Sequence, residues 1–249
     1  MRFTAIAIAP LPDIDTARQN HDLHDLCDED VGKVLFHRRK QQGKGERLGW
    51  DQLRIGAVSM VHVGASHTHI ESISLHQRPE TELLDAIFRI MRKLPPLVTW
   101  GGRCSLIPLL QFRSLVHRRN AFDYWTCAEG GRDPHVDLQV ELLGRPELTG
   151  APSLDEMAQR LCLPGMLGHS EDRLWDHWLA GNHEAASTYA AYEALNTAML
   201  ALEINHLKGR CARADADALH ARLVETVSRA KPAARYWDWL NAVEAHDPT

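Results

Sequence analysis

Alternating and continuous apolar segments along the chain predict several short β-strands. Residues 3–9 form an Ile- and Ala-rich run that we expect to end at Pro10, because proline lacks a backbone donor. Residues 53–63 alternate between apolar and polar positions and residues 70–75 alternate again after a turn, which predicts a hairpin. Two more short strands are predicted, over residues 97–100 and 135–138.

Apolar positions three and four residues apart predict helices in the remaining segments. Ser153 and Glu156 form a capping box that opens a helix running through Leu161. Residues 18–42 are polar with short helical faces, and residues 43–49 are a glycine-rich loop. Further helices are predicted over residues 80–93, 105–118, 171–180, 183–208 and 215–230. This order predicts an α/β fold with a mixed central sheet and a helical C-terminal half.

The composition is that of an ordinary globular protein. The 249 residues include 28 basic and 33 acidic side chains, so the net charge is −5 and the whole surface is not built to coat nucleic acid. No apolar run approaches the roughly 20 residues of a membrane helix, and the apolar start is too short for a signal peptide. The five cysteines are scattered without a CxxC pair, which argues against a disulfide framework and a structural zinc site. We therefore expect a cytoplasmic protein that does not enter membranes.

Several short motifs occur in a fixed order between residues 3 and 210, and the tail after about residue 211 lies outside them. They are Leu11-Pro12-Asp13, Cys27-Asp28-Glu29-Asp30-Val31, Phe36-His37-Arg38-Arg39, Val98-Thr99-Trp100-Gly101-Gly102, Ile107-Pro108-Leu109-Leu110, His135-Val136-Asp137-Leu138, Ser153-Leu154-Asp155-Glu156, Leu163-Pro164-Gly165 and Tyr189 with Leu195-Asn196-Thr197. Each motif is weak alone, but the ordered set resembles the bacterial predicted 3′-5′ exonucleases related to the proofreading domain of B-family DNA polymerases. The resemblance implies an RNase H-like fold.

The resemblance also implies a catalytic site in which four carboxylates hold two divalent ions that polarise a phosphate and activate water. In this chain all four positions differ. The Asp-x-Glu of the first strand falls on Ala7 and Ala9, and the second-motif Asp falls on Leu106. The last Asp falls on Glu193, one helical turn after the retained Tyr189, which moves the charge outward by one methylene. Tyr189 and Glu193 are therefore the remnants of the catalytic set.

Two alternatives would keep a metal site. Asp13 and Asp15 imitate the first motif, and a six-residue slip of the alignment would restore two carboxylates. Asp137 could instead join Glu193 in a weaker site, although a structural, hydrogen-bonding role for Asp137 is favoured. No cofactor is expected in the leading interpretation, whereas Mg²⁺ or Mn²⁺ would be needed if either alternative holds.

Basic residues gather in two places that could neutralise phosphates of a single strand. They are Arg38, Arg39 and Lys40 in the first, and Arg113, Arg118 and Arg119 in the second. Either group alone is more typical of a solvated face. Aromatic residues at Tyr236, Trp237 and Trp239 could stack on bases, but they more often anchor a terminal helix.

The leading hypothesis is a degenerate, inactive exonuclease-like protein that binds nucleic acid or a protein partner without cutting. Residues 1–210 would form the RNase H-like domain and residues 211–249 a helical extension packed on it. One alternative is a divergent active 3′-5′ exonuclease acting on single-stranded DNA or RNA. Another is a structural protein-interaction module, for example a homodimer. Oligonucleotide titration at varied salt separates these hypotheses.

Overall fold

A computed structural model describes residues 2–43, 47–92, 96–120, 124, 126, 134–144 and 151–246. Residues 44–46 of the predicted loop and Lys93 at the end of a predicted helix lie outside the described residues. The strands are β1 (Phe3–Pro12), β2 (Leu53–Val63), β3 (Thr68–Ser74), β4 (Leu97–Thr99) and β5 (His135–Asp137). The helices that precede the last strand are α1 (Ile14–His21), α2 (Asp28–Gln41), the 3-10 turn η1 (Trp50–Gln52), α3 (Glu80–Met91) and α4 (Leu106–His117).

The second half of the described chain is helical, as the sequence predicts. Its helices are α6 (Leu138–Leu143), α7 (Leu154–Arg160), the 3-10 turn η2 (Glu171–Arg173), α8 (Leu174–Leu179), α9 (Glu184–Leu207), α10 (Arg213–Ser228) and α11 (Ala233–His246). The capping box at the start of α7 is present, with Ser153 and Glu156 each accepting from the other's backbone N–H. The last helix, α11, is anchored by Tyr236 and Trp239, which are 1% and 0% exposed, so the anchoring interpretation of these aromatics is confirmed.

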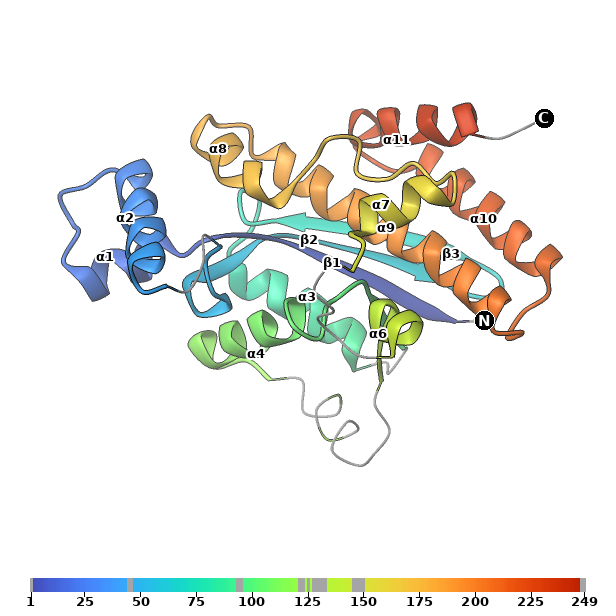
Figure 1. The fold of residues 1–249 in the computed structure, drawn as a ribbon, viewed down its shortest axis with the longest axis horizontal. Helices are drawn as coiled ribbons and strands as arrows, with labels where there is room; N and C mark the ends of the chain where they lie inside the picture. Colours follow the sequence, from blue (N-terminus) through green and yellow to red (C-terminus); the bar gives the residue numbers. More distant parts are fainter. Residues whose placement is uncertain are drawn as a thin grey trace.

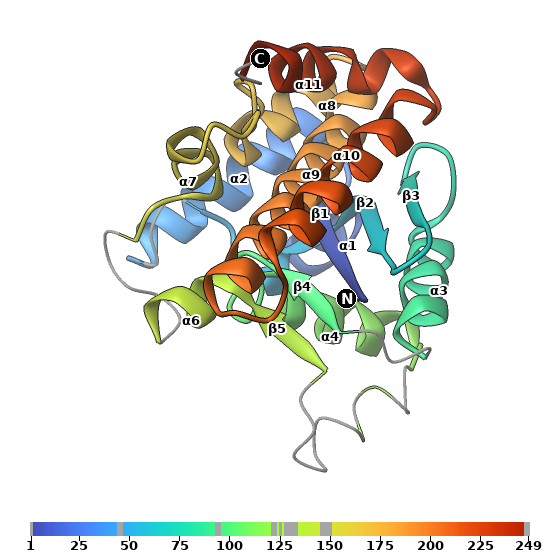
Figure 2. The same cartoon turned by 90° about the vertical axis from the view of Figure 1, so that its right-hand side faces the viewer.

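The sheet has the strand order β3-β2-β1-β4-β5 in the described residues. The hairpin of β2 and β3 is confirmed, and both β1–β2 and β2–β3 are antiparallel. Strands β4 and β5 are added in parallel at the other side of β1. The helices α9, α10 and α11 lie over one face, and α3 and α4 lie under the other (Figures 1 and 2). This mixed sheet with helices on both faces is the predicted α/β arrangement.

The prediction that Pro10 ends the first strand is wrong, because β1 continues to Pro12. Two features let the prolines fit. The pairing of β1 with β2 shifts register between Ala9 and Pro10, which is the irregularity at which proline is tolerated. On its other side β1 pairs with β4 only at Thr4 and Ala5, so its far half is an edge where a missing N–H breaks no ladder.

The two faces of β1 carry different side chains. Ala5 and Ala7 pack in the core cluster formed with α9, whose facing positions include Ala191 and Ala194. Small residues on both sides let the helix and strand approach closely. Ile6 and Ile8 point to the opposite cluster, where they meet residues of α3 and α4. The helices α1 and α2 extend beyond the far end of β1 (Figure 1).

Candidate functional site

A pocket of about 260 Å³ opens beside the free edge of β1. Its lining comes from β1, the segment around η1, the turn after β4, the start of α4, and α9. The apolar lining residues are Ile6, Ile8, Pro10, Leu48, Leu53, Leu106 and Leu109. The aromatic and polar ones are Arg47, Trp50, Thr99, Trp100, Cys104, Ser105, Glu171, Tyr189 and Glu193. The pocket therefore has an apolar floor and a polar end that is rich in carboxyl groups.

Tyr189 and Glu193 occupy one face of α9, one turn apart, where their side chains interact electrostatically. Burial raises the pKa of Glu193 to about 8, and the nearby carboxylate of Glu171 adds to the shift. Burial and the same two carboxyl groups hold the pKa of Tyr189 well above its usual range. The pKa of Glu171 is also raised by desolvation, an effect that the Arg47 guanidinium partly offsets. At neutral pH this end of the pocket thus carries less negative charge than its composition implies.

The turn Trp100-Gly101-Gly102 shapes the opposite wall. Gly101 has a φ of +67°, a left-handed conformation that favours glycine. A Cβ on Gly102 would lie 2.4 Å from the Thr99 hydroxyl oxygen, so this position also excludes a side chain. The Asp137 carboxylate accepts hydrogen bonds from the backbone N–H groups of Gly101 and Arg103, at 2.9 Å each. Asp137 is therefore the structural carboxylate that the sequence favoured, and it holds the turn that places Trp100 in the pocket.

The four positions that the sequence resemblance assigns to the family carboxylates do not all face this pocket. Leu106 is the first residue of α4 and lines the pocket together with Glu193. Ala7 and Ala9 are 1% and 0% exposed and belong to the core. From β1 the pocket is lined by Ile6, Ile8 and Pro10 instead. Two of the four positions are thus in the pocket and two are in packed interior.

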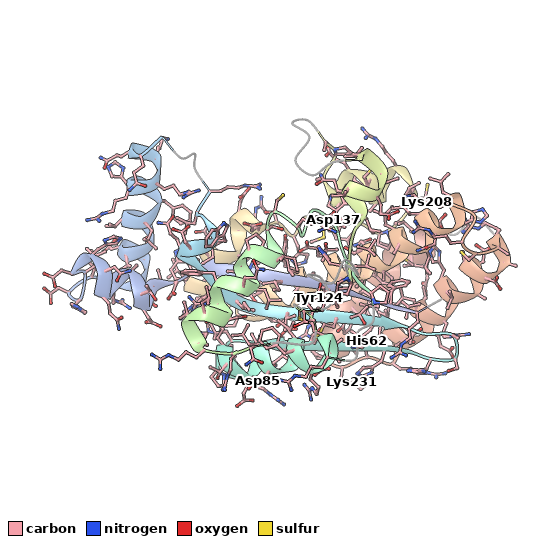
Figure 3. The ribbon with its side chains drawn as sticks, turned by 90° about the horizontal axis from the view of Figure 1, so that it is seen from below. His62, Asp85, Tyr124, Asp137, Lys208 and Lys231 are labelled. Carbon is pink, nitrogen blue, oxygen red and sulfur yellow. The ribbon has the colours of Figure 1, made fainter. Side chains whose placement is uncertain are left out.

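The carboxylates of the two alternative metal sites are engaged elsewhere. Asp13 accepts from the Thr16 hydroxyl and from the Arg113 guanidinium, and Asp15 pairs with Arg54 at 3.0 Å. Asp137 lies near α6, far from the blue α1 helix that follows Asp13 (Figure 3). The structure therefore does not bring Asp13, Asp15, Asp137 and Glu193 together. Within the described ranges, no group of three or more His, Cys, Asp or Glu side chains is arranged to hold a metal ion.

The first basic group lies at the end of α2. Arg38 and Lys40 are exposed there. Arg39 is half-buried and donates to the backbone oxygen of Arg47, so it fixes the segment that leads into the pocket. Arg38 is also hydrogen-bonded to His21, at 2.9 Å, so the group is tied in part to its own segment.

The second basic group is only partly as predicted. The expectation that Arg113 belongs to a surface patch is wrong, because its side chain is buried between Asp13 and Glu80. Arg118 and Arg119 are exposed at the end of α4, where Arg119 pairs with Asp85 of α3. Figure 3 places Asp85 on the opposite side of the view from α2, so the two basic groups do not form one surface.

Sequence reasoning missed Trp50 and Glu171 as residues of the site. Trp50 begins a 3-10 turn, is 47% exposed, and meets Phe112 edge to face with ring centroids 5.4 Å apart. Glu171 begins the turn before α8. Neither residue belongs to a local sequence pattern. Tertiary structure alone brings both to the pocket, so the sequence did not reveal them.

The sheet order, the helix α9 crossing it, and the Tyr189–Glu193 pair define an RNase H-like protein of the exonuclease type. The chain belongs to the family described as predicted 3′-5′ exonucleases related to the exonuclease domain of PolB, whose model matches residues 48–243. The match includes α10 and most of α11, whereas β1, α1 and α2 precede it. No curated protein matches the chain. None of the helices in the described segments is long and apolar enough to cross a bilayer.

Proposed function

We propose that this protein is a catalytically inactive member of its family that binds single-stranded nucleic acid without cutting it. The observation that carries the proposal is the donor set at the pocket. Leu106 lines it where the family has an Asp, and Ala7 and Ala9 replace the first-strand acids inside the core. Hard divalent ions need several oxygen ligands, and Glu193 with its neighbour Glu171 does not provide a cage for two of them. The residues of the pocket therefore do not fit a two-metal centre.

Binding is supported by what remains around the pocket. Trp50 and Trp100 offer aromatic surface to bases, and Arg47 lies at the same opening. The exposed Arg38 and Lys40 follow Phe36 on α2, close to the segment that Arg39 ties to Arg47. The proposal includes a reducing, cytoplasmic setting, in which the free thiols of Cys27, Cys104, Cys162 and Cys211 would stay reduced.

A nuclease assay tests the inactive assignment. The full chain is incubated with 5′-labelled single-stranded DNA and RNA in the presence of Mg²⁺ or Mn²⁺, and products are resolved by length. We expect no shortening beyond that of a buffer control. Metal-dependent trimming from the 3′ end that disappears in Glu193→Ala would overturn the proposal and establish the divergent active exonuclease.

A salt-dependent titration tests the binding assignment. We expect affinity for single strands that falls steeply with salt and is weakened about uniformly across sequences in the double variant Arg38→Gln/Lys40→Gln. Arg229→Gln, an exposed cation at the end of α10, is the matched control and should leave affinity unchanged. Absence of binding even at low salt would contradict the proposal and favour the protein-interaction module or a homodimer.

A further inference from the structure

A hollow of about 680 Å³, here called the β1 hollow, lies at the start of β1. Its lining comes from the first residues of β1, the end of β2, the turn to β3, the start of β3 and the last turn of α3. Figure 1 marks this end of β1 with N, at the opposite end of the strand from α1 and α2. Among the described residues it shares no lining residue with the pocket beside the free edge of β1. Its volume lies within the range of roughly 300–1,000 Å³ that is usual for small-molecule sites.

Basic side chains outnumber acidic ones at the β1 hollow. Arg2 and Arg89 line it together with one carboxylate, that of Glu71. Arg222 of α10 adds a third guanidinium, which donates to the carbonyl oxygen of Ala65 in the turn at 2.7 Å. The pocket beside the free edge of β1 is lined instead by two carboxyl groups and one arginine. The charge balance therefore favours an anion at the β1 hollow.

The single carboxylate of the hollow does not occupy Arg89 fully. Arg89 faces Glu71 at 3.4 Å, and the two side chains are 60% and 27% exposed. An ion pair that is exposed to this extent is weak, because water screens it. A guanidinium has five N–H donors, so Arg89 can hold a phosphate oxygen while it still faces Glu71.

Three histidines add hydrogen-bond donors to the same hollow. His62 and His69 are directly opposite each other on β2 and β3, with nearly parallel rings whose centroids are 5.9 Å apart. Thr4 of β1 orients His62, because its hydroxyl lies 2.8 Å from Nδ1 of the imidazole. His67 and His69 are exposed at the hollow. A neutral imidazole still carries one N–H, so both can donate to an anion without being charged.

The hollow also has an apolar floor. Phe3, Val63 and Ile90 line it and are 4%, 2% and 8% exposed. A bare ion would leave this floor in contact with water, whereas the organic part of an ester would cover it. The histidines do not form a metal centre with other ligands in the described ranges. The lining therefore fits an organic anion with several acceptor oxygens.

We infer that the β1 hollow is a binding site for a phosphomonoester group. Arg2 and Arg89 bind the phosphate oxygens, and His67 and His69 donate further hydrogen bonds. A phosphomonoester carries about two negative charges near neutral pH and has three terminal oxygens that accept hydrogen bonds. It therefore matches several donors from different elements better than a phosphodiester does, which carries one charge. The inference does not rest on the proposed function, because that function places the strand at the other pocket.

Calorimetric titration with ribose 5-phosphate tests the inference, because this probe has no base that would enter the other pocket. EDTA is present throughout, so that bridging by metal ions does not contribute. We expect ribose 5-phosphate to bind and inorganic phosphate to compete with it. The methyl diester of the same sugar phosphate should bind about 5- to 10-fold more weakly, because it has lost one charge. Equal binding by ribose, which has no phosphate, would overturn the inference.

Variants locate the binding. Arg89→Gln should weaken it about 5- to 10-fold. Arg78→Gln is the matched control and should leave it unchanged, because Arg78 faces Glu82 in a similarly exposed pair at the other end of α3, outside the hollow. Glu71→Gln should strengthen binding about 2- to 5-fold, since it removes the carboxylate that opposes the phosphate. Damage to the fold does not produce such a gain. Unchanged affinity in both Arg89→Gln and Glu71→Gln would contradict the inference.

Two oligonucleotides that differ only in a 5′-phosphate or a 5′-hydroxyl identify the source of the phosphomonoester. A preference for the phosphorylated strand that Arg89→Gln removes would assign the group to a strand end. Binding of ribose 5-phosphate without that preference would assign it to a small molecule. Both results support the site. Failure of ribose 5-phosphate to bind, together with equal binding of the two strands, would overturn the inference and leave the proposed function standing. Binding of ribose 5-phosphate without binding of either strand would refute the proposed function alone.

Discussion

Two regions of the molecule treat buried acids in opposite ways. Beyond the end of β1, Arg113 lies between Asp13 and Glu80, with all three side chains about 5% exposed. Glu80 also accepts from the backbone N–H of Ile55 at 2.8 Å and from His117. A few residues earlier on β1, at the positions to which the sequence resemblance assigns the first-strand acids, the chain has Ala7 and Ala9. The buried carboxylates of Asp13 and Glu80 are thus paired with a protein cation, whereas the alanines of β1 pack in the core without any charge to compensate.

The largest loss of stability is expected where Arg113 pairs with Asp13 and Glu80. Arg113→Leu would leave Asp13 and Glu80 buried without their cation, which costs about 3–5 kcal/mol of the free energy of unfolding. Urea unfolding followed by circular dichroism measures it. Arg119→Leu is the control, because this exposed arginine only faces Asp85 at 3.5 Å and should change stability by less than about 1 kcal/mol. Equal losses in the two variants would show that the network is not what holds α1, α3 and α4 together.

Adding a charge to β1 at Ala7 should also destabilise the fold. Ala7→Asp puts a carboxyl among the packed residues under α9, and we expect a loss of about 2–4 kcal/mol at neutral pH. Ala7→Asn has nearly the same shape without the charge, so the difference in urea midpoint between the two variants isolates the charge. Millimolar Mg²⁺ should not restore Ala7→Asp. A rescue by Mg²⁺ would mean that the region can still assemble a metal site.

The sequence could predict features that depend on local patterns, and it could not predict those that depend on contacts between distant residues. Local patterns located the hairpin, the capping box of α7 and the helix α9, because alternation and capping act within a few residues. The burial of Arg113 could not be found that way. Its neighbours His117, Arg118 and Arg119 make it resemble a surface residue, and its partner Asp13 lies 100 residues earlier in the chain.

The sequence likewise predicted only some of the residues that line the pocket. Tyr189 and Glu193 could be identified because their spacing within one helix is a local feature. Trp50 and Glu171 could not, since the walls they form depend on how η1 and η2 meet α9. The continuation of β1 through Pro10 was missed for a related reason, because tolerance of proline depends on the absence of a β4 partner beyond Ala5.

A smaller effect, with a distinct pH dependence, is expected at Asp13. Burial alone would raise the pKa of this carboxyl, but the Arg113 guanidinium and the Thr16 hydrogen bonds outweigh it and hold the pKa below its usual value. In the acid range the unfolded chain therefore binds more protons, and stability rises with pH. Asp13→Asn keeps an N-cap acceptor for Thr16, so it should cost about 1–2 kcal/mol at neutral pH through the lost charge. The cost should vanish as the pH falls through the lowered pKa, as acid-range urea titrations would show. A cost that is constant with pH would mean that Arg113 does not stabilise the ionised form.

Glu193 should show the opposite pH dependence, because its pKa is raised by burial and by Glu171 to about 8. The native state therefore binds more protons than the unfolded chain between the ordinary glutamate pKa and about pH 8, and stability falls as pH rises through that window. Glu193→Gln retains an acceptor for Tyr189 and does not ionise, so it should stabilise the protein by about 1 kcal/mol at slightly alkaline pH, a value reduced because the pocket admits water. Below pH 4 the variant and the wild type should be equally stable.

Thermal unfolding measured from pH 4 to slightly alkaline pH tests this prediction. The control variant is Glu82→Gln, at an exposed residue of α3. Equal stability of Glu193→Gln and the wild type at every pH, with Asp13→Asn behaving as expected, would show that burial does not raise the pKa of Glu193. The contrast between paired and unpaired acids would then fail at the pocket.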